Sequence, residues 1–276
     1  MNRKRKQLRI LVFGAHPDDC DIKAGGIALH YSALGHRVKF VSVTNGDTGH
    51  FEVGGIELAR RRYAEAQAAG RVAGVEYGVL DIHNGELEPS VANRKMIIRI
   101  IREFQPDLVL THRPNDYHPD HRYTSLLVQD AAYIVTVPNM VPLTPHLQYN
   151  PVICYLSDNF QKPTPFAPDA VVEIDRVIER KMDMLHCHVS QMYEWLPYNS
   201  NRLKEVPKGE RARRSWLGRL RKPAFEEIAN RYRDRLIELY GEKRGKKVRY
   251  AEAFEACEYG GKLTGKNLKV LFPFFG

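Results

Sequence analysis

The chain has 276 residues, of which 43% are hydrophobic and 27% charged, and its formal net charge is +9 at pH 7. This length and balance are typical of one globular α/β domain and exclude a disordered chain. No apolar run approaches the roughly 20 residues that would cross a bilayer, which excludes an integral membrane protein.

The positive charge gathers in two clusters, at 2–6 and 204–222. It either keeps the protein soluble or attracts an anionic partner. We favour the first interpretation and expect no nucleic-acid partner, because neither cluster carries a nucleic-acid-binding motif. Apolar residues 10–15 are too few for the core of a secretion signal. Four cysteines without paired spacing favour free thiols in a cytoplasmic protein.

Short apolar runs alternate with longer helical patterns along the chain. The runs predict strands at 8–13, 38–43, 77–80, 107–111, 152–156 and 170–174. Helical spacing predicts helices at 22–34, 56–72, 94–104, 176–193 and 223–240. This alternation predicts a mostly parallel, Rossmann-like sheet of order 3-2-1-4-5 plus later strands, flanked by helices. We expect a single domain over 1–276, with a basic loop or insertion at about 196–222.

Two polar blocks follow the first and fourth predicted strands. The first is Ala15-His16-Pro17-Asp18-Asp19, and the second is Asp116-Tyr117-His118-Pro119-Asp120-His121. Strands one and four are neighbours in the predicted order, so both blocks should meet in one crevice at the carboxyl ends of the strands.

Imidazoles together with carboxylates are ligands that suit Zn²⁺, and a catalytic zinc usually has three protein ligands and one open position. Such a site favours attack of a metal-activated water on a carbonyl. A structural alternative is that Asp18, Asp19 and Asp120 only cap the helices that follow them. Two such blocks at corresponding strand ends favour the metal site.

With these motifs in place, the chain resembles the LmbE-like, PIG-L-type N-deacetylase family over about residues 8–136. The resemblance implies a Rossmann-like sheet and a zinc ion, for which Fe²⁺ would fit the same ligands. It implies these metal ligands: His16, Asp19 and His121. It also implies Asp18 as the general base, and His118 as the group that polarises the amide carbonyl or protonates the leaving amine. Asp120 would orient His118 and keep it cationic.

The same resemblance implies residues that border the substrate. Arg62 and Glu65 match the family's R-x-x-E helix, and Asn45 and Asp47 fall in the loop after the second strand. Asp116, just before the second block, is also in place. Family members often carry an acidic residue shortly before a glycine in the loop after the third strand. Here Asn84 precedes Gly85, which would change substrate contacts without touching the metal.

Several other residues have open or structural interpretations. His188 and Gln191 lie in a segment that resembles the family's H-x-S-Q, and they either line the pocket or satisfy each other in the core. Cys20 is expected near the metal without being a ligand. Five histidines are interpreted as structural or surface residues: His30, His36, His83, His112 and His186.

The expected function is zinc-dependent removal of an N-acetyl group from a small, N-acetylglucosamine-containing molecule. The homo-oligomeric state is left open. A first rival is a metal hydrolase that cleaves another amide or an ester. A second is a Rossmann-like ligand-binding protein without catalysis. Against the second, no G-x-G-x-x-G follows the first strand, and carboxylates in that turn would repel phosphate.

Overall fold

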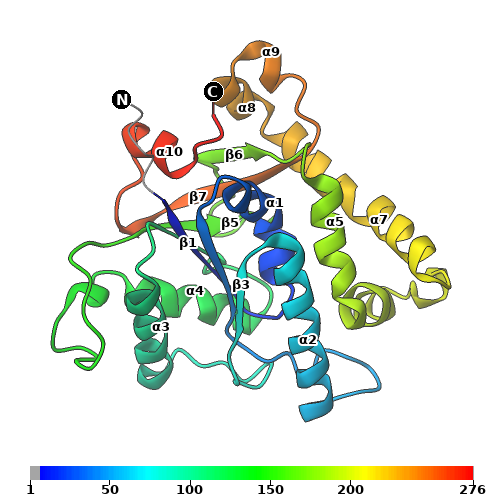
Figure 1. The fold of residues 1–276 in the computed structure, drawn as a ribbon, viewed down its shortest axis with the longest axis horizontal. Coiled ribbons are helices and arrows are strands. Elements are labelled where there is room, and N and C mark those ends of the chain that lie inside the picture. Colours follow the sequence, from blue (N-terminus) through cyan, green and yellow to red (C-terminus); the bar gives the residue numbers. More distant parts are fainter. Residues whose placement is uncertain (1–6, 276) are drawn as a thin grey trace.

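The computed structural model describes residues 7–275, so the basic cluster at 2–6 lies outside the described residues. Its centre is a seven-stranded sheet with helices on both faces (Figure 1). The strands are β1 (Arg9–Gly14), β2 (Arg37–Ser42), β3 (Glu76–Val79), β4 (Leu108–Thr111), β5 (Val152–Leu156), β6 (Ala170–Glu173) and β7 (Ala251–Gly260).

The sheet order is β3-β2-β1-β4-β5-β7-β6, which confirms the predicted 3-2-1-4-5 core. The strands of that core pair in parallel, whereas β7 is antiparallel to both β5 and β6. Alternate residues of each strand point to opposite faces of the sheet. Ile10 and Val12 therefore join one buried cluster, and Leu11 and Phe13 join another.

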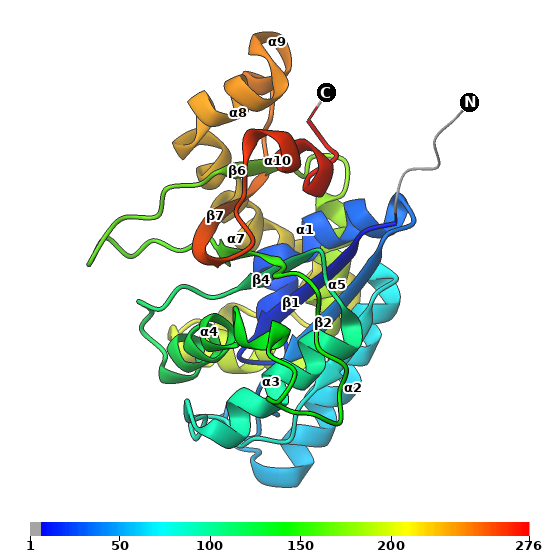
Figure 2. The same cartoon turned by 90° about the vertical axis from the view of Figure 1, so that its left-hand side faces the viewer.

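The two faces are covered by different helices (Figure 2). One face packs against α1 (Asp19–Ala33), α2 (Gly55–Ala73), α5 (Ile178–Cys187) and α10 (Gly265–Leu271). The other packs against α3 (Val91–Phe104) and α4 (Pro119–Ala131). The remaining helices are η1 (Ile134–Thr136), η2 (Ser190–Trp195, a π-helix), α6 (Leu196–Asn199), η3 (Leu203–Glu205), α7 (Glu210–Arg231), α8 (Arg233–Tyr240) and α9 (Glu242–Gly245). Within 7–275, no helix is both long and apolar enough to cross a membrane.

The prediction of a loop or insertion at about 196–222 is wrong for the second half of this segment. There the chain is helical, because α7 begins at Glu210. Arginine and glycine in this segment suggested an irregular chain, and Pro223 suggested a helix start. Trp216 and Leu217 are buried against Met182 and Leu185 of α5, and this packing stabilises a helix that continues through Pro223. The helices α5 and α7 lie side by side in Figure 1.

The longest strand, β7, was not predicted. Its sequence, AEAFEACEYG, is rich in alanine and glutamate, which favour helices. Its backbone pairs on both sides, with β5 and with β6, and this pairing outweighs the local preference. The predicted helix at 176–193 is likewise divided, because α5 ends at Cys187 and the π-helix η2 follows.

A buried ion pair joins the sheet to two helices. Lys181 of α5 and Glu252 of β7 are 0% and 1% exposed and form a salt bridge. Lys181 Nζ also donates to Ile22 O at 2.8 Å, and the Glu252 carboxylate accepts from Gly26 N and Ile27 N of α1 at 2.7 and 2.8 Å. A Cβ at position 26 would lie 2.6 Å from Ile174 Cγ2, so glycine is required for this close approach.

We predict that Lys181→Met destabilises the fold by about 3–5 kcal/mol, because it leaves the buried Glu252 carboxylate without its counter-charge. The measurement is the free energy of unfolding from urea denaturation. Lys95→Met, at an exposed position on α3, is the control and should stay within about 0.5 kcal/mol of wild type. Equal unfolding midpoints for the two variants would contradict the importance of the ion pair.

Candidate metal centre and cavity

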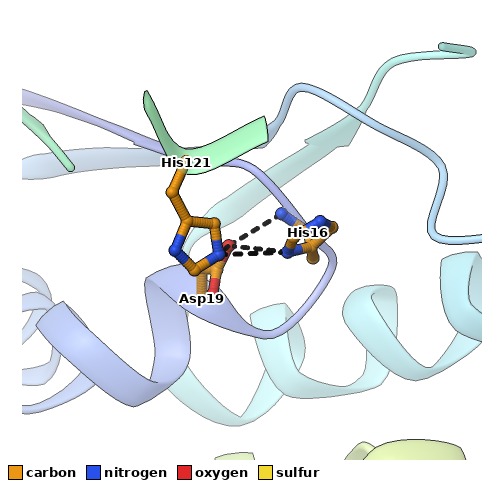
Figure 3. Close-up of side chains that lie close together, drawn as sticks. All are labelled: His16, Asp19 and His121. Atoms are coloured by element: carbon orange, nitrogen blue, oxygen red, sulfur yellow. Dashed lines mark hydrogen bonds and ion pairs between the residues drawn. The ribbon is translucent and has the colours of Figure 1, made fainter. Parts of the chain in front are cut away.

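Three side chains from the two polar blocks converge at the carboxyl ends of β1 and β4 (Figure 3). His16 follows β1, Asp19 begins α1, and His121 lies in the first turn of α4. Asp19 Oδ2 is 3.4 Å from both His16 Nδ1 and His121 Nε2, and the two nitrogens are 3.2 Å apart. We call these three atoms the ligand triangle.

The triangle fits a tetrahedral metal ion. Ligand atoms about 2.0–2.1 Å from a zinc ion lie about 3.3 Å apart along the edges of a tetrahedron. Each imidazole also contacts a carboxylate through its outer nitrogen: His16 Nε2 is 3.1 Å from Asp120 Oδ2, and His121 Nδ1 is 3.0 Å from Asp116 Oδ1. Such carboxylates hold the proton on the outer nitrogen and turn the inner lone pair toward a cation.

The charge around the triangle favours a cation as well. Burial alone would lower the pKa of His121, but the Asp19 and Asp116 carboxylates outweigh it and raise this pKa to about 10. Burial would likewise raise the pKa of Asp19, but the His121 and His112 imidazoles hold it well below its usual range. The buried carboxylates therefore require positive charge at this point.

Asp18 is held beside the triangle by a buried arginine. Arg62 of α2 is 2% exposed, and its Nη2 donates to Asp18 Oδ1 at 3.0 Å while its Nη1 donates to Gly46 O at 3.1 Å. Asp18 is the N-cap residue of α1, but its side chain makes no capping hydrogen bond. The capping alternative therefore does not explain this carboxylate.

The predicted pairing of Asp120 with His118 differs from the structure. Asp120 Oδ2 lies 3.8 Å from His118 Nδ1, and it contacts His16 Nε2 at 3.1 Å and Gly85 N at 2.7 Å instead. His118 Nδ1 accepts from Asp120 N at 3.2 Å as the N-cap of α4. Burial, with the neighbouring His16 and His121 rings, lowers the pKa of His118. This shift opposes the predicted cationic state of His118, although the Asp120 charge acts in its favour.

Three residues that were expected to border the substrate are not among the residues that line the cavity: Asn45, Asp47 and Glu65. Their side-chain oxygens form hydrogen bonds with other groups of the protein. Asp47 accepts from Asn84 N at 3.0 Å and contacts His83 Nδ1 at 2.5 Å. Asn45 donates to Asp81 at 3.0 Å, and its own oxygen accepts from Asp47 N at 3.1 Å. Glu65 accepts from the backbone and the hydroxyl of Ser190, at 2.9 and 2.6 Å. Within the described chain these three residues connect loops and helices.

One of the histidines interpreted as structural or surface residues is buried directly beside the ligand triangle. His112 directly follows β4 and is 2% exposed. Its ring stacks on His121 with centroids 4.1 Å apart and planes 9° apart, and its Nε2 accepts from Ala15 N at 3.1 Å. Burial lowers the pKa of His112 to about 4, so the ring is neutral. Its position at the end of a central strand was the available signal.

Of the two residues considered in the H-x-S-Q segment, Gln191 lines the cavity and His188 lies in the core. Gln191 borders the cavity, and its Nε2 donates to Gly49 O at 3.0 Å. His188 is fully buried, with Nε2 3.1 Å from Asp21 Oδ2. Cys20 is buried as well, and its thiol lies 3.6 Å from Val12 O, outside the triangle.

A cavity of about 660 Å³ opens above the triangle. Its floor includes the two blocks, through Asp18, Asp116 and His118. Its walls come from α1, the loop after β5, η2 and α7, with these residues among them: Lys23, Asp158, Phe160, Trp195, Arg221 and Ile228. This volume lies within the range of about 300–1,000 Å³ that small-molecule sites occupy.

Comparison with known proteins gives consistent relatives. A family model described as PIG-L, GlcNAc-PI de-N-acetylase, matches residues 11–132. A diacetylchitobiose deacetylase of Thermococcus kodakarensis is 32% identical over 207 residues, which cover 69% of this chain and 74% of that protein. The solved N,N'-diacetylchitobiose deacetylase of Pyrococcus horikoshii has a TM-score of 0.70 and 26% identity, covering 93% of this chain and 86% of that one.

A relative with a different named activity also matches. A 4-oxalmesaconate hydratase of Pseudomonas putida is 26% identical over 206 residues, which cover 71% of this chain and 79% of that protein. The same fold therefore carries more than one named chemistry among the relatives of this chain.

The Asp47–His83 contact supplies a pH-dependent prediction. The hydrogen bond between the exposed His83 and Asp47 raises the pKa of His83 above 6.5. Because the pKa of His83 is higher in the folded than in the unfolded protein, the pair stabilises the fold fully at pH values below the unfolded-state pKa. This stabilisation is lost as the pH rises through the folded-state pKa. We predict that Asp47→Asn lowers the pKa of His83, measured by NMR titration of the imidazole. His146, which contacts Gln148, is the internal control. An unchanged His83 titration would contradict the assignment.

Proposed function

Because this chain belongs to the PIG-L (LmbE-like) family, we propose that it is a zinc-dependent N-deacetylase. Its substrate is a small molecule that contains N-acetylglucosamine, as the named deacetylase relatives suggest. The observation that carries the proposal is the ligand triangle of His16, Asp19 and His121 beside the carboxylate of Asp18. The four free thiols favour a cytoplasmic location.

The triangle would hold Zn²⁺, and Fe²⁺ suits the same donors. When bound, such an ion supplies Lewis acidity that polarises a carbonyl and acidifies a water. Asp120 and Asp116 orient the two histidine ligands through their outer nitrogens, at 3.1 and 3.0 Å. These two carboxylates therefore support the ligands, and neither is placed to take a proton from the substrate.

Asp18 acts as the general base in this proposal. Its carboxylate borders the cavity and is held by the ion pair with Arg62 at 3.0 Å. It accepts the proton of the attacking water, and the protonated carboxyl can then return that proton to the nitrogen that leaves. Arg62 thus acts as a positioning residue for Asp18.

His118 would donate to the acetyl carbonyl oxygen as a neutral imidazole. Since its Nδ1 accepts from Asp120 N at 3.2 Å, the proton of the neutral ring resides on Nε2. The ring borders the cavity and stands edge-on to His16, with centroids 4.5 Å apart. A donor fixed toward the reacting oxygen stabilises negative charge that develops there.

The hydratase relative supports a second candidate function. A base beside a divalent ion could also add water across a carbon–carbon double bond of an unsaturated carboxylate, the kind of reaction that the name of the Pseudomonas protein implies. The two reactions differ in product, because only deacetylation releases acetate. A single product assay therefore separates them.

We predict that the zinc-loaded protein releases acetate from N-acetylglucosamine conjugates and that Asp18→Asn lowers kcat by about 10²-fold or more. The variant should keep its metal, because Asp18 is outside the triangle, whereas His121→Ala should lose it. Acetate assays and metal analysis by mass spectrometry are the measurements. Acetate release from Asp18→Asn at the wild-type rate would contradict the base assignment. Absence of acetate from every conjugate, with metal bound, would contradict the deacetylase proposal.

We predict that Arg62→Ala lowers kcat by about 10²-fold, with a smaller effect on KM, because the variant frees the Asp18 carboxylate to move. The family resemblance places Arg62 at the border of the substrate site, where its loss would raise KM; the ion pair with Asp18 moves the expected effect to kcat. Arg60→Ala, at an exposed position on the same helix, should change neither constant more than about twofold. If Arg62→Ala raises KM and leaves kcat unchanged, Arg62 binds the substrate directly and does not position Asp18.

A further inference from the structure

An arginine enters the cavity from α7 without a carboxylate partner. Among the described residues, the one hydrogen bond of the Arg221 guanidinium is a weak contact from Nη2 to Met192 Sδ at 3.5 Å. Its Nε is buried and makes no hydrogen bond. Burial lowers the pKa of this guanidinium. Arg221 is half-buried, and a charged group whose Nε is shielded from water is costly unless a ligand completes its hydrogen bonds.

The two other arginines buried near the cavity are fully charge-paired. Arg62 pairs with Asp18 at 3.0 Å. Arg113 contacts Asp158 at 3.1 Å and Glu255 at 3.3 Å. Arg62 and Arg113 thus each have a carboxylate within ion-pair distance. None of the described carboxylates lies that close to Arg221, on which the Asp18 charge acts only at longer range.

Lys23 is a second cation on the cavity wall. It lies one helical turn after Asp19 on α1, and its Nζ donates to the backbone oxygen of Ser157 at 2.8 Å. This bond uses one of the three donors of the ammonium group. Among the described residues no carboxylate lies within ion-pair distance of Lys23. Lys23 lies within electrostatic reach of the Asp19, Asp116 and Asp158 carboxylates and also of Arg221.

The surroundings of Arg221 strengthen its attraction for an anion. Ala224, Phe225 and Ile228 of the same helix border the cavity and provide an apolar wall. Ion pairing gains strength where water is displaced by such a wall. In contrast, Asp18, Asp19 and Asp116 repel an anion from the floor of the cavity. A substrate with an anionic substituent would therefore be oriented, with that substituent toward α7.

We propose that Arg221, assisted by Lys23, binds a carboxylate or phosphate group that the substrate carries beside its N-acetylated sugar. This inference rests on the proposed deacetylase function for the identity of the sugar. It makes Arg221 a specificity-determining residue, and it explains why a cation stands unpaired in the wall of the cavity.

The test compares 4-carboxyphenyl and 4-carbamoylphenyl N-acetyl-β-glucosaminides, which are nearly equal in shape and differ in charge. N-acetylglucosamine 1-phosphate is a third substrate, whose kcat/KM is also compared with that of the carbamoyl glycoside. The carboxylate and the phosphate substrates show which of the two anions Arg221 binds. We expect the zinc-loaded wild type to favour the carboxylate over the amide in kcat/KM by about tenfold or more, the effect of a hydrogen bond to a charged group. In Arg221→Gln this ratio should fall toward one.

Arg219→Gln is the matched control, because Arg219 is exposed on the same helix and its Nη1 donates to Ser215 at 3.0 Å. It should keep the wild-type ratio. If the ratio of kcat/KM for the charged substrate to that for the amide is the same in wild type and Arg221→Gln, for both the carboxylate and the phosphate substrate, the proposal is overturned. A change confined to inhibition by acetate would also overturn it, because Arg221 would then bind the product.

Binding measured by isothermal titration calorimetry separates this proposal from the proposed function. The 4-carboxyphenyl glycoside is titrated into wild type, Arg221→Gln and Arg219→Gln. If no glycoside releases acetate but Arg221→Gln alone raises the Kd by about tenfold, the anion site is supported and the deacetylase function fails. If acetate is released and the Kd is equal in all three proteins, the deacetylase stands and the anion site is overturned.

Discussion

The parallel pairing of β1 with β4 is the constraint on which the site depends. Their register aligns Leu11 with Val109, so the two strands end at the same edge of the sheet. His16 and His121 are separated by 105 residues in sequence, yet their ring nitrogens lie 3.2 Å apart. Neither block holds a complete ligand set, so the site exists only when this central pair of strands has formed.

Carboxylates behind the ligands define the chemical state of the imidazoles. Asp120 and Asp116 each contact the outer nitrogen of one ligand histidine, at 3.1 and 3.0 Å. This arrangement directs the Asp120 carboxylate to His16, while the backbone N–H of Asp120 donates to His118 and orients its ring. In the proposed mechanism, support for the metal ligands and donation to the substrate therefore come from different groups.

The second half of the chain determines the shape of the cavity. Helix α7 packs on α5 through Trp216 and Leu217, and the same helix presents Arg221 to the cavity. Lys181 and Glu252 join α5 and β7 to α1, which carries Asp19. Elements far from the two blocks thereby form one wall of the cavity, and we propose that this wall determines the substrate specificity that the shared fold leaves open.

The sequence by itself determined the order of the central strands and the meeting of the two polar blocks, because apolar runs and polar strand ends are local signals. Which three residues of those blocks form the ligand triangle was implied by the family resemblance. Only the tertiary structure decided the partner of Asp120, the place of His112 and the burial of Asp47. It also decided that β7 is a strand and that Arg221 lies on a helix. These features depend on hydrogen bonds and packing between segments distant in sequence, and such contacts outweigh local preference.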